Sequence, residues 1–258
     1  MCLAGNRVRE MTTLRTDECA GENRVHGIKR RPAWRSEALF AEFSAVETQD
    51  PRLKRKAAVI FETDTASEYD ARHLAARLAE KFGDWPAAIA AYLAIWDKDE
   101  DNHYRGLRHL LHAVTGEPET SIHARMEGRH PNFADIAPFI DDPFQFLVAL
   151  AYDECVTVQA YATDYPLYDA LGPGAGRWVR LTNRDEALHY ANAVRLVRCL
   201  YRDRIDEVPA MLERLVAHDQ QRGPYRATFL LDHDHPLLYF SPDRLRRSAK
   251  RVERAFCR

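Results

Sequence analysis

The sequence predicts an all-α fold, in which four long helices form a bundle with a long crossover and additional C-terminal helices. Three observations predict it. Apolar residues recur at intervals of three and four along four long segments, which is the period of a helix. Clusters of Gly and Pro separate these segments from one another. No segment of useful length alternates apolar and polar residues as a half-buried strand does.

The first two predicted helices form a pair joined by a short turn. The first covers 66–82 and carries apolar residues such as Leu74 and Leu78 on one face. The second covers 86–114 and ends at Gly116, because glycine commonly follows the last turn of a helix.

A long crossover then leads to the second half of the chain. Four prolines divide 116–143 into short pieces, one of which is a short helix over 120–127. The remaining predicted helices, in chain order, cover 144–171, 176–201, 206–218 and the basic segment after 242, and Gly172-Pro173-Gly174 separates the first two of them.

The composition predicts a mobile leader over 1–36, followed by one helical domain over 37–258. The formal charge is −2 and 46% of the residues are hydrophobic, which argues against wholesale disorder and against general nucleic-acid binding. No apolar run reaches the roughly 18 residues of a membrane span. The five cysteines are scattered and form no Cys-x-x-Cys pair, so we expect a reducing, cytoplasmic compartment.

A doubled pattern of acidic and histidine residues dominates the chain. In each copy a lone Glu precedes a Glu-x-x-His motif by the same interval, since 100 − 68 = 32 and 186 − 154 = 32: the first copy is Glu68, Glu100 and His103, and the second is Glu154, Glu186 and His189. Residues three apart share a helix face, so each motif presents an oxygen and a nitrogen to one point. Ferritin-like bundles that hold two iron or manganese ions use this ligand set. The sequence therefore predicts six ligands from four helices around two metal ions.

These motifs resemble those of the soluble di-iron acyl-[acyl-carrier-protein] desaturases, within the ferritin-like superfamily. The family's second helix has Glu-Glu-Asn-Arg-His after a Trp, and here Trp96 precedes Asp99-Glu100-Asp101-Asn102-His103. Its fourth helix has Asp-Glu-Lys-Arg-His, and here the residues are Asp185-Glu186-Ala187-Leu188-His189. Its third helix has Glu-x-x-Thr, which Glu154 and Thr157 match. The resemblance covers roughly Glu68 to Leu215.

The resemblance implies a role for each matched residue. The six residues of the doubled pattern would be iron ligands, with Glu100 and Glu186 bridging the two ions. Thr157 would stand near the oxygen-binding face, and Trp96 would line the same interior layer. Asp99 and Asp185 would accept hydrogen bonds from the second ring nitrogen of each ligand histidine, which fixes the ring's orientation.

The first-helix ligand stays open between two positions. Glu62 precedes Glu100 by 38 residues, an interval that longer members of the family show. We prefer Glu68, because its interval of 32 matches the second half of the chain.

Carboxylate and imidazole ligands suit Fe2+, or manganese together with iron. We therefore expect an O2-activating oxidoreductase that oxidises an unactivated C–H bond, by desaturation or hydroxylation, of an acyl-type or small-molecule substrate. The chain has no dinucleotide fingerprint and no cysteine set for an iron–sulfur cluster, so an external donor such as a ferredoxin-type protein must supply electrons. The basic C-terminal segment suits an acidic acyl-carrier protein. The resemblance also implies a homodimer.

Two other functions fit the same ligands. An N-oxygenase that acts on amines shares the doubled motif but adds a third His one turn before the second Glu-x-x-His, where this chain has Thr182. A non-catalytic ferritin-like iron-binding protein is the other alternative, although the long crossover and the basic tail fit a cage-forming subunit poorly.

Overall fold

The computed structural model describes residues 28–43, 50–81, 85–221, 225–231, 233 and 240–257, and within them every regular element is helical. The prediction of an all-α fold is therefore confirmed for this part of the chain. Four helices are long: α2 (Pro51–Lys81), α3 (Ala87–Thr115), α6 (Pro143–Leu171) and α7 (Pro173–Leu200). The shorter ones are η2 (Ser36–Leu39), α1 (Phe40–Phe43), α4 (Glu119–Glu127), α5 (Ala137–Ile140), η3 (Arg202–Glu207), α8 (Val208–Gln220) and α9 (Pro242–Phe256).

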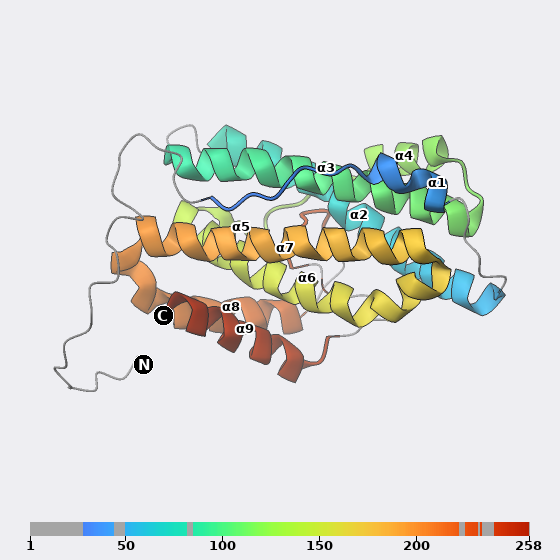
Figure 1. Cartoon of the computed structure of the whole chain (residues 1–258). Helices are drawn as coiled ribbons and strands as arrows, with labels where there is room; N and C mark the ends of the chain where they lie inside the picture. The colour runs from blue at the N-terminus through green and yellow to red at the C-terminus, as the bar shows by residue number, and fades with distance from the viewer. Residues whose placement is uncertain are drawn as a thin grey trace.

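The long helices pack as two pairs of neighbours, α2 with α3 and α6 with α7. Helices that follow each other through short connections pack antiparallel. The two pairs meet through α3 and α7, and through the rings of Phe61 on α2 and Tyr168 on α6, whose centroids are 5.1 Å apart. Figure 1 shows α3, α7 and α6 running lengthwise beside one another, with α8 and α9 along the lower side. The result is a helical bundle with one added layer.

α6 is buried on all sides along its first half, from Phe146 to Val156 without interruption. A helix that is apolar all round belongs in the centre of a protein. The reason here is that α7 covers one face while α8 and α9 pack on another. The additional C-terminal helices therefore complete the core around α6.

The ends of α6 follow from local chemistry. Pro143 occupies the first turn, where its missing N–H costs nothing, and Asp142 caps the helix by accepting a hydrogen bond from the Gln145 N–H at 2.9 Å. Gly172 ends it with φ of 132°, a backbone conformation that favours glycine. Pro173 then starts α7, so the fourth long helix begins three residues before the predicted Gly176.

The first long helix is also longer than predicted. α2 begins at Pro51 rather than at residue 66, because Ala57, Ile60 and Phe61 continue its buried stripe toward the N-terminus. The basic residues at 52 and 54–56, which precede this stripe, interrupt the apolar period at the start of α2. The other predicted helices lie within a few residues of their observed bounds.

Residues 28–36, which the sequence assigned to a mobile leader, contact the bundle. The Lys29 N–H donates to Asn192 Oδ1 at 2.8 Å, and Asn192 Nδ2 donates back to the Lys29 carbonyl at 3.0 Å. Ser36 is buried and bonds to both the side chain and the carbonyl of Asn102 at 2.7 Å. This segment therefore belongs with the helical domain; the rest of the expected leader lies outside the described residues. Among the described helices, none has the length and apolar character needed to cross a membrane.

Gly106 marks a close crossing of this segment with α3 and α7. A Cβ atom at Gly106 would overlap the indole nitrogen of Trp178 and approach Ser36 Oγ to 2.8 Å. The Trp178 indole donates a hydrogen bond to Ser36 Oγ at 2.9 Å, so neither group can move away without breaking that bond. We expect Gly106→Ala to lower the free energy of unfolding by about 1–3 kcal/mol, the usual cost of overpacking.

Urea unfolding followed by circular dichroism measures that change. Gly128→Ala is the matched control, since its Cβ would meet only carbonyl oxygens at 3.6 and 3.8 Å. Equal stability of the two variants would contradict the steric explanation.

Candidate metal centre

Six buried side chains from four helices meet in the middle of the bundle. They form two overlapping groups whose ligand atoms lie within 4.8 Å of one another. One group is Glu68, Glu100, His103 and Glu186, and the other is Glu100, Glu154, Glu186 and His189. These are the six residues of the doubled sequence pattern. Glu100 and Glu186 belong to both groups.

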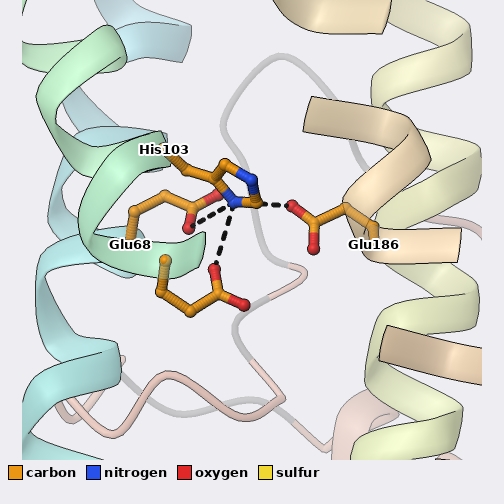
Figure 2. A group of neighbouring side chains, drawn as sticks. Glu68, His103 and Glu186 are labelled. Atoms are coloured by element: carbon orange, nitrogen blue, oxygen red, sulfur yellow. Dashed lines mark hydrogen bonds and ion pairs between the residues drawn. The ribbon is translucent and has the colours of Figure 1, made fainter. Parts of the chain in front are cut away.

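The histidine of the first group faces three carboxylates through one nitrogen (Figure 2). His103 Nδ1 lies 3.2 Å from Glu186 Oε1, 3.3 Å from Glu100 Oε2 and 3.6 Å from Glu68 Oε2. Ligand atoms about 2.1 Å from a common ion, at right angles to each other, would be about 3 Å apart. The spacing therefore suits a metal ion among these four atoms.

The second group has the same arrangement around His189, which faces the other oxygen of each of the two glutamates that both groups contain. His189 Nδ1 lies 3.0 Å from Glu186 Oε2, 3.2 Å from Glu100 Oε1 and 3.5 Å from Glu154 Oε1. Each shared carboxylate thus offers one oxygen to each histidine. Such a carboxylate can bridge two ions.

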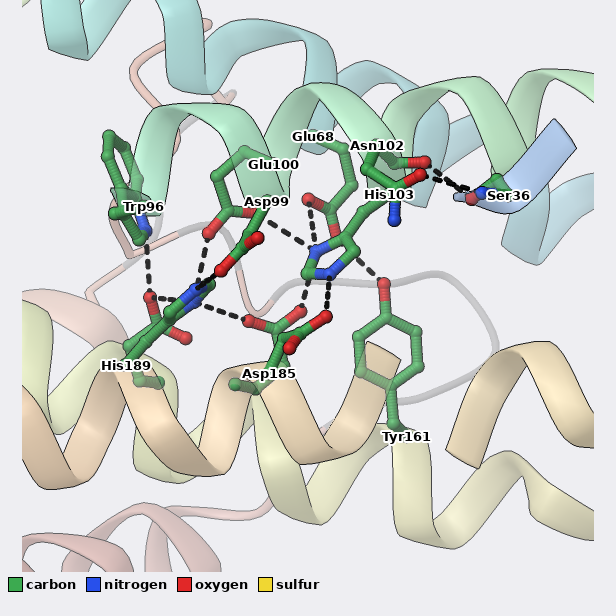
Figure 3. A network of polar contacts seen from close by, with 12 residues as sticks. Ser36, Glu68, Trp96, Asp99, Glu100, Asn102, His103, Tyr161, Asp185 and His189 are labelled. Atoms are coloured by element: carbon green, nitrogen blue, oxygen red, sulfur yellow. Dashed lines mark hydrogen bonds and ion pairs between the residues drawn. The ribbon is translucent and has the colours of Figure 1, made fainter. Parts of the chain in front are cut away.

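The second nitrogen of each histidine points to an aspartate (Figure 3). His103 Nε2 lies 3.3 Å from Asp185 Oδ2, and His189 Nε2 lies 3.2 Å from Asp99 Oδ2. An aspartate in this position keeps the proton on Nε2 and leaves the Nδ1 lone pair for a ligand bond.

Glu68 and Glu154 each belong to only one of the two ligand groups, and each accepts a hydrogen bond from an aromatic side chain. The Trp96 indole N–H donates to Glu154 Oε1 at 3.0 Å, and the Tyr161 hydroxyl donates to Glu68 Oε1 at 2.7 Å. Trp96 was identified from the sequence as a candidate site residue, but Tyr161 was not. A signal for Tyr161 exists, because it lies seven residues after Glu154 and therefore on the same face of α6.

Two further residues beside the cluster, in the N-terminal segment, were also not identified from the sequence. The Trp34 indole donates to Asp185 Oδ2 at 2.7 Å, and the Arg31 guanidinium forms an ion pair with the same carboxylate. No spacing rule links these residues to α7, since they are 151 and 154 positions away in the chain. Only the tertiary fold brings them together.

The remaining predicted residues lie as follows. Thr157 lies in the wall of a cavity that reaches Glu68. Glu62, the alternative ligand, is far more exposed and binds Arg125. The structure thus brings Glu68, and not Glu62, into the cluster. Thr182 is fully buried.

Burial and crowding shift the pKa of nearly every group in the cluster. Burial, followed by repulsion from Glu186, raises the pKa of Glu100 and Glu154 well above the usual value, and burial raises that of Glu68. Burial acts against the protonated histidines, but the carboxylates around them outweigh it and raise the pKa of His103 and His189 well above the usual value. The two histidines in turn outweigh the burial of Glu186 and lower its pKa. Without metal, the cluster therefore retains several protons.

Three buried carboxylate oxygens of the cluster face the histidine nitrogens but find no hydrogen-bond partner within the described part of the chain: Glu68 Oε2, Glu100 Oε1 and Glu186 Oε1. Unsatisfied buried oxygens are costly, and a buried set of carboxylates is normally paired or bound to metal. Carboxylate and imidazole ligands suit iron, manganese or zinc. The described residues thus form a helical bundle with a buried cluster that could hold metal ions. Comparison of the chain with family models, with curated proteins and with solved structures finds no match.

Asp185 and Asp99 differ in burial and in their partners, so we expect their removal to affect metal binding to different extents. Asp185 is buried and its pKa is lowered, because His103, Arg31 and Trp34 together outweigh burial, whereas the Asp99 side chain is 35% exposed. Removing a residue that hydrogen-bonds to a ligand histidine typically weakens metal binding by about 10–100-fold. We expect Asp185→Asn to lower the affinity for Mn2+ more than Asp99→Asn does, as measured by competition with a chelating dye. A larger effect of Asp99→Asn would contradict this reading of the structure.

Proposed function

We propose that this chain is a ferritin-like di-iron oxidoreductase that uses O2 to oxidise an unactivated C–H bond, by desaturation or hydroxylation. The observation that carries the proposal is the pair of overlapping ligand groups that share Glu100 and Glu186. Two ions joined by bridging carboxylates are close enough to act together on one O2 molecule. The resemblance of the motifs to the soluble acyl-[acyl-carrier-protein] desaturases supports the same class.

The donor set fits iron. Four carboxylates would balance the charge of two Fe2+ ions, so the loaded site would be close to neutral in the apolar interior. Bound iron would supply electrons for the reduction of O2. The aspartates at Nε2 keep both histidines in the tautomer that ligation requires, and Trp96 and Tyr161 fix the unshared carboxylates.

The surroundings keep water from most of the cluster. All six side chains are at least nine-tenths buried, and the fully buried Tyr92 and Trp96 lie beside His189 and Glu154, respectively. A dry site protects an oxidising centre from side reactions. The substrate would be an acyl-type or other small molecule with a C–H bond that reaches this interior.

We propose that an external ferredoxin-type protein supplies the electrons. The exposed side of α9 carries Arg246, Arg247, Lys250, Arg251 and Arg254. Such a surface would steer an acidic partner, and its effect on the association rate would weaken with salt.

The test loads the protein with Fe(II) without oxygen, counts the bound iron, and then admits O2. The proposal expects about two irons per chain, oxygen uptake, and a Mössbauer spectrum that changes from Fe(II) to a coupled pair of Fe(III) ions. Substrate screening would follow with acyl-carrier-protein esters and with small amines. Binding of two irons without O2 consumption would instead support a non-catalytic iron-binding protein, and an absence of stoichiometric iron would contradict both.

A further inference from the structure

A cavity between α2 and α6 leads to the cluster from outside. It has a volume of about 70 Å3, enough for a few water molecules. Its lining includes Thr63, Asp64, Ser67, Glu68, Thr157, Tyr161 and Asp164. Glu68 is 6% exposed and the other five cluster residues are 0–1% exposed, so this cavity reaches the cluster member nearest to solvent.

Most of the lining residues are polar, although apolar atoms make up the larger part of the exposed wall. Three carboxylates, four hydroxyl groups and His233 line the cavity together with Ala160 and Phe240. Carboxylate and hydroxyl oxygens are ligands for a hard, partly hydrated divalent cation.

Asp164 points to a cation more directly. Its side chain is only 5% exposed, yet no hydrogen bond or ion pair within 4 Å involves it among the described residues. Burial raises its pKa to about 6, although Lys56 and Arg244 oppose this at longer range. A largely buried carboxylate at the wall of the cavity is a suitable ligand for a cation that passes through it.

We propose that this cavity is the route by which divalent metal ions enter the buried cluster, with Asp164 as the transit ligand that passes the ion to Glu68. The inference rests on the proposed metal-binding function. Ions would meet Asp164 first, lose part of their water among the hydroxyls, and reach Glu68 Oε2, which faces His103 Nδ1 at 3.6 Å. Tyr161, which donates to Glu68 Oε1, would keep the other oxygen of that carboxylate oriented.

The test separates the rate of loading from the amount of metal bound. Co(II) is mixed with the metal-free protein in a stopped-flow instrument, and its visible absorption reports entry into the cluster; bound metal is then counted after equilibration. Asp164→Asn should slow uptake by about tenfold, the lower end of what electrostatic focusing supplies. The final content should remain two ions per chain. The variant should fold normally, since the carboxylate it removes makes no hydrogen bond to any residue that the structure describes.

Two further variants make the test specific. Glu62→Gln removes the same charge from α2, but at an exposed position paired with Arg125, and should load at the rate of the unaltered protein. Ala160→Phe keeps every carboxylate and narrows the cavity, so it should slow uptake as well. Slow uptake by both Asp164→Asn and Ala160→Phe supports the route.

Three outcomes would overturn the inference. Uptake at the unaltered rate in both variants would place the route elsewhere, while a count of two ions would leave the proposed function intact. A drop to one ion per chain in Asp164→Asn would make Asp164 a permanent ligand instead of a transit one. Failure of the unaltered protein to bind any metal would remove the proposed function together with the route.

Discussion

Glu186→Ala should remove both metal ions, whereas Glu154→Ala should remove only one. Glu186 belongs to both ligand groups and places one oxygen beside each histidine, at 3.2 and 3.0 Å. Glu154 belongs to the second group alone. The iron content after anaerobic loading and desalting should therefore fall from about two per chain to near zero in the first variant, and to about one in the second.

The control for this pair is Glu62→Ala, on the same helix as Glu68 but exposed and bound to Arg125. It should retain two irons. Circular dichroism must show that all three variants keep their helical content, so that the loss of iron reflects the ligands and not unfolding. If Glu186→Ala and Glu154→Ala lost the same number of ions, the shared role of Glu186 would be wrong.

Metal binding should raise the melting temperature by about 10 °C. A ligand present at a thousandfold excess over its dissociation constant stabilises the folded state by about 4 kcal/mol. For a chain of this size each kcal/mol shifts the midpoint by roughly 2–4 °C. Mn2+ is the suitable ion for calorimetry, since it does not react with O2 during the scan. Glu186→Ala should show little of this shift.

The size of that shift should grow with pH. In the metal-free protein the pKa values of Glu68, Glu100, Glu154, His103 and His189 are raised above the usual 4.5 and 6.5. Groups with raised pKa values hold more protons in the folded state, so their stabilising contribution is complete below the usual values and is lost as the pH rises through the folded ones. Glu186, whose pKa is lowered, acts in the opposite sense and only at acid pH.

Metal-free protein should therefore melt at a lower temperature at about pH 8 than at about pH 6. Metal requires deprotonated ligands and displaces those protons, so its affinity rises over the same range. The melting temperatures with and without Mn2+ should therefore differ more as the pH increases. Parallel pH dependence with and without Mn2+ would show that the cluster groups are not the ones that bind it.

The four long helices and the six clustered residues could be predicted because both depend on short periods in the chain. A spacing of three places Glu100 with His103 on one face whatever surrounds the helix, and the equal interval of 32 pairs each motif with its lone glutamate. The early start of α2 was missed because basic residues at 52 and 54–56 interrupt the apolar period before Ala57.

Contacts between distant segments could not be predicted in this way. Trp34 and Arg31 reach Asp185 from more than 150 residues away, and no local period encodes such a distance. Asp164 has no hydrogen-bond or ion-pair partner within the described ranges, and this too depends on the tertiary fold and not on a local period of the sequence.

The extended segment before η2 also affects how the protein can be shortened. A version trimmed to the long helices would begin at Pro51 and lose Lys29, Trp34 and Ser36. Asn192, Asp185 and the Trp178 indole would each lose a hydrogen-bond partner on one side of the bundle. A truncated protein intended for crystallisation or spectroscopy should therefore start upstream of residue 28, even though the first regular helix begins later.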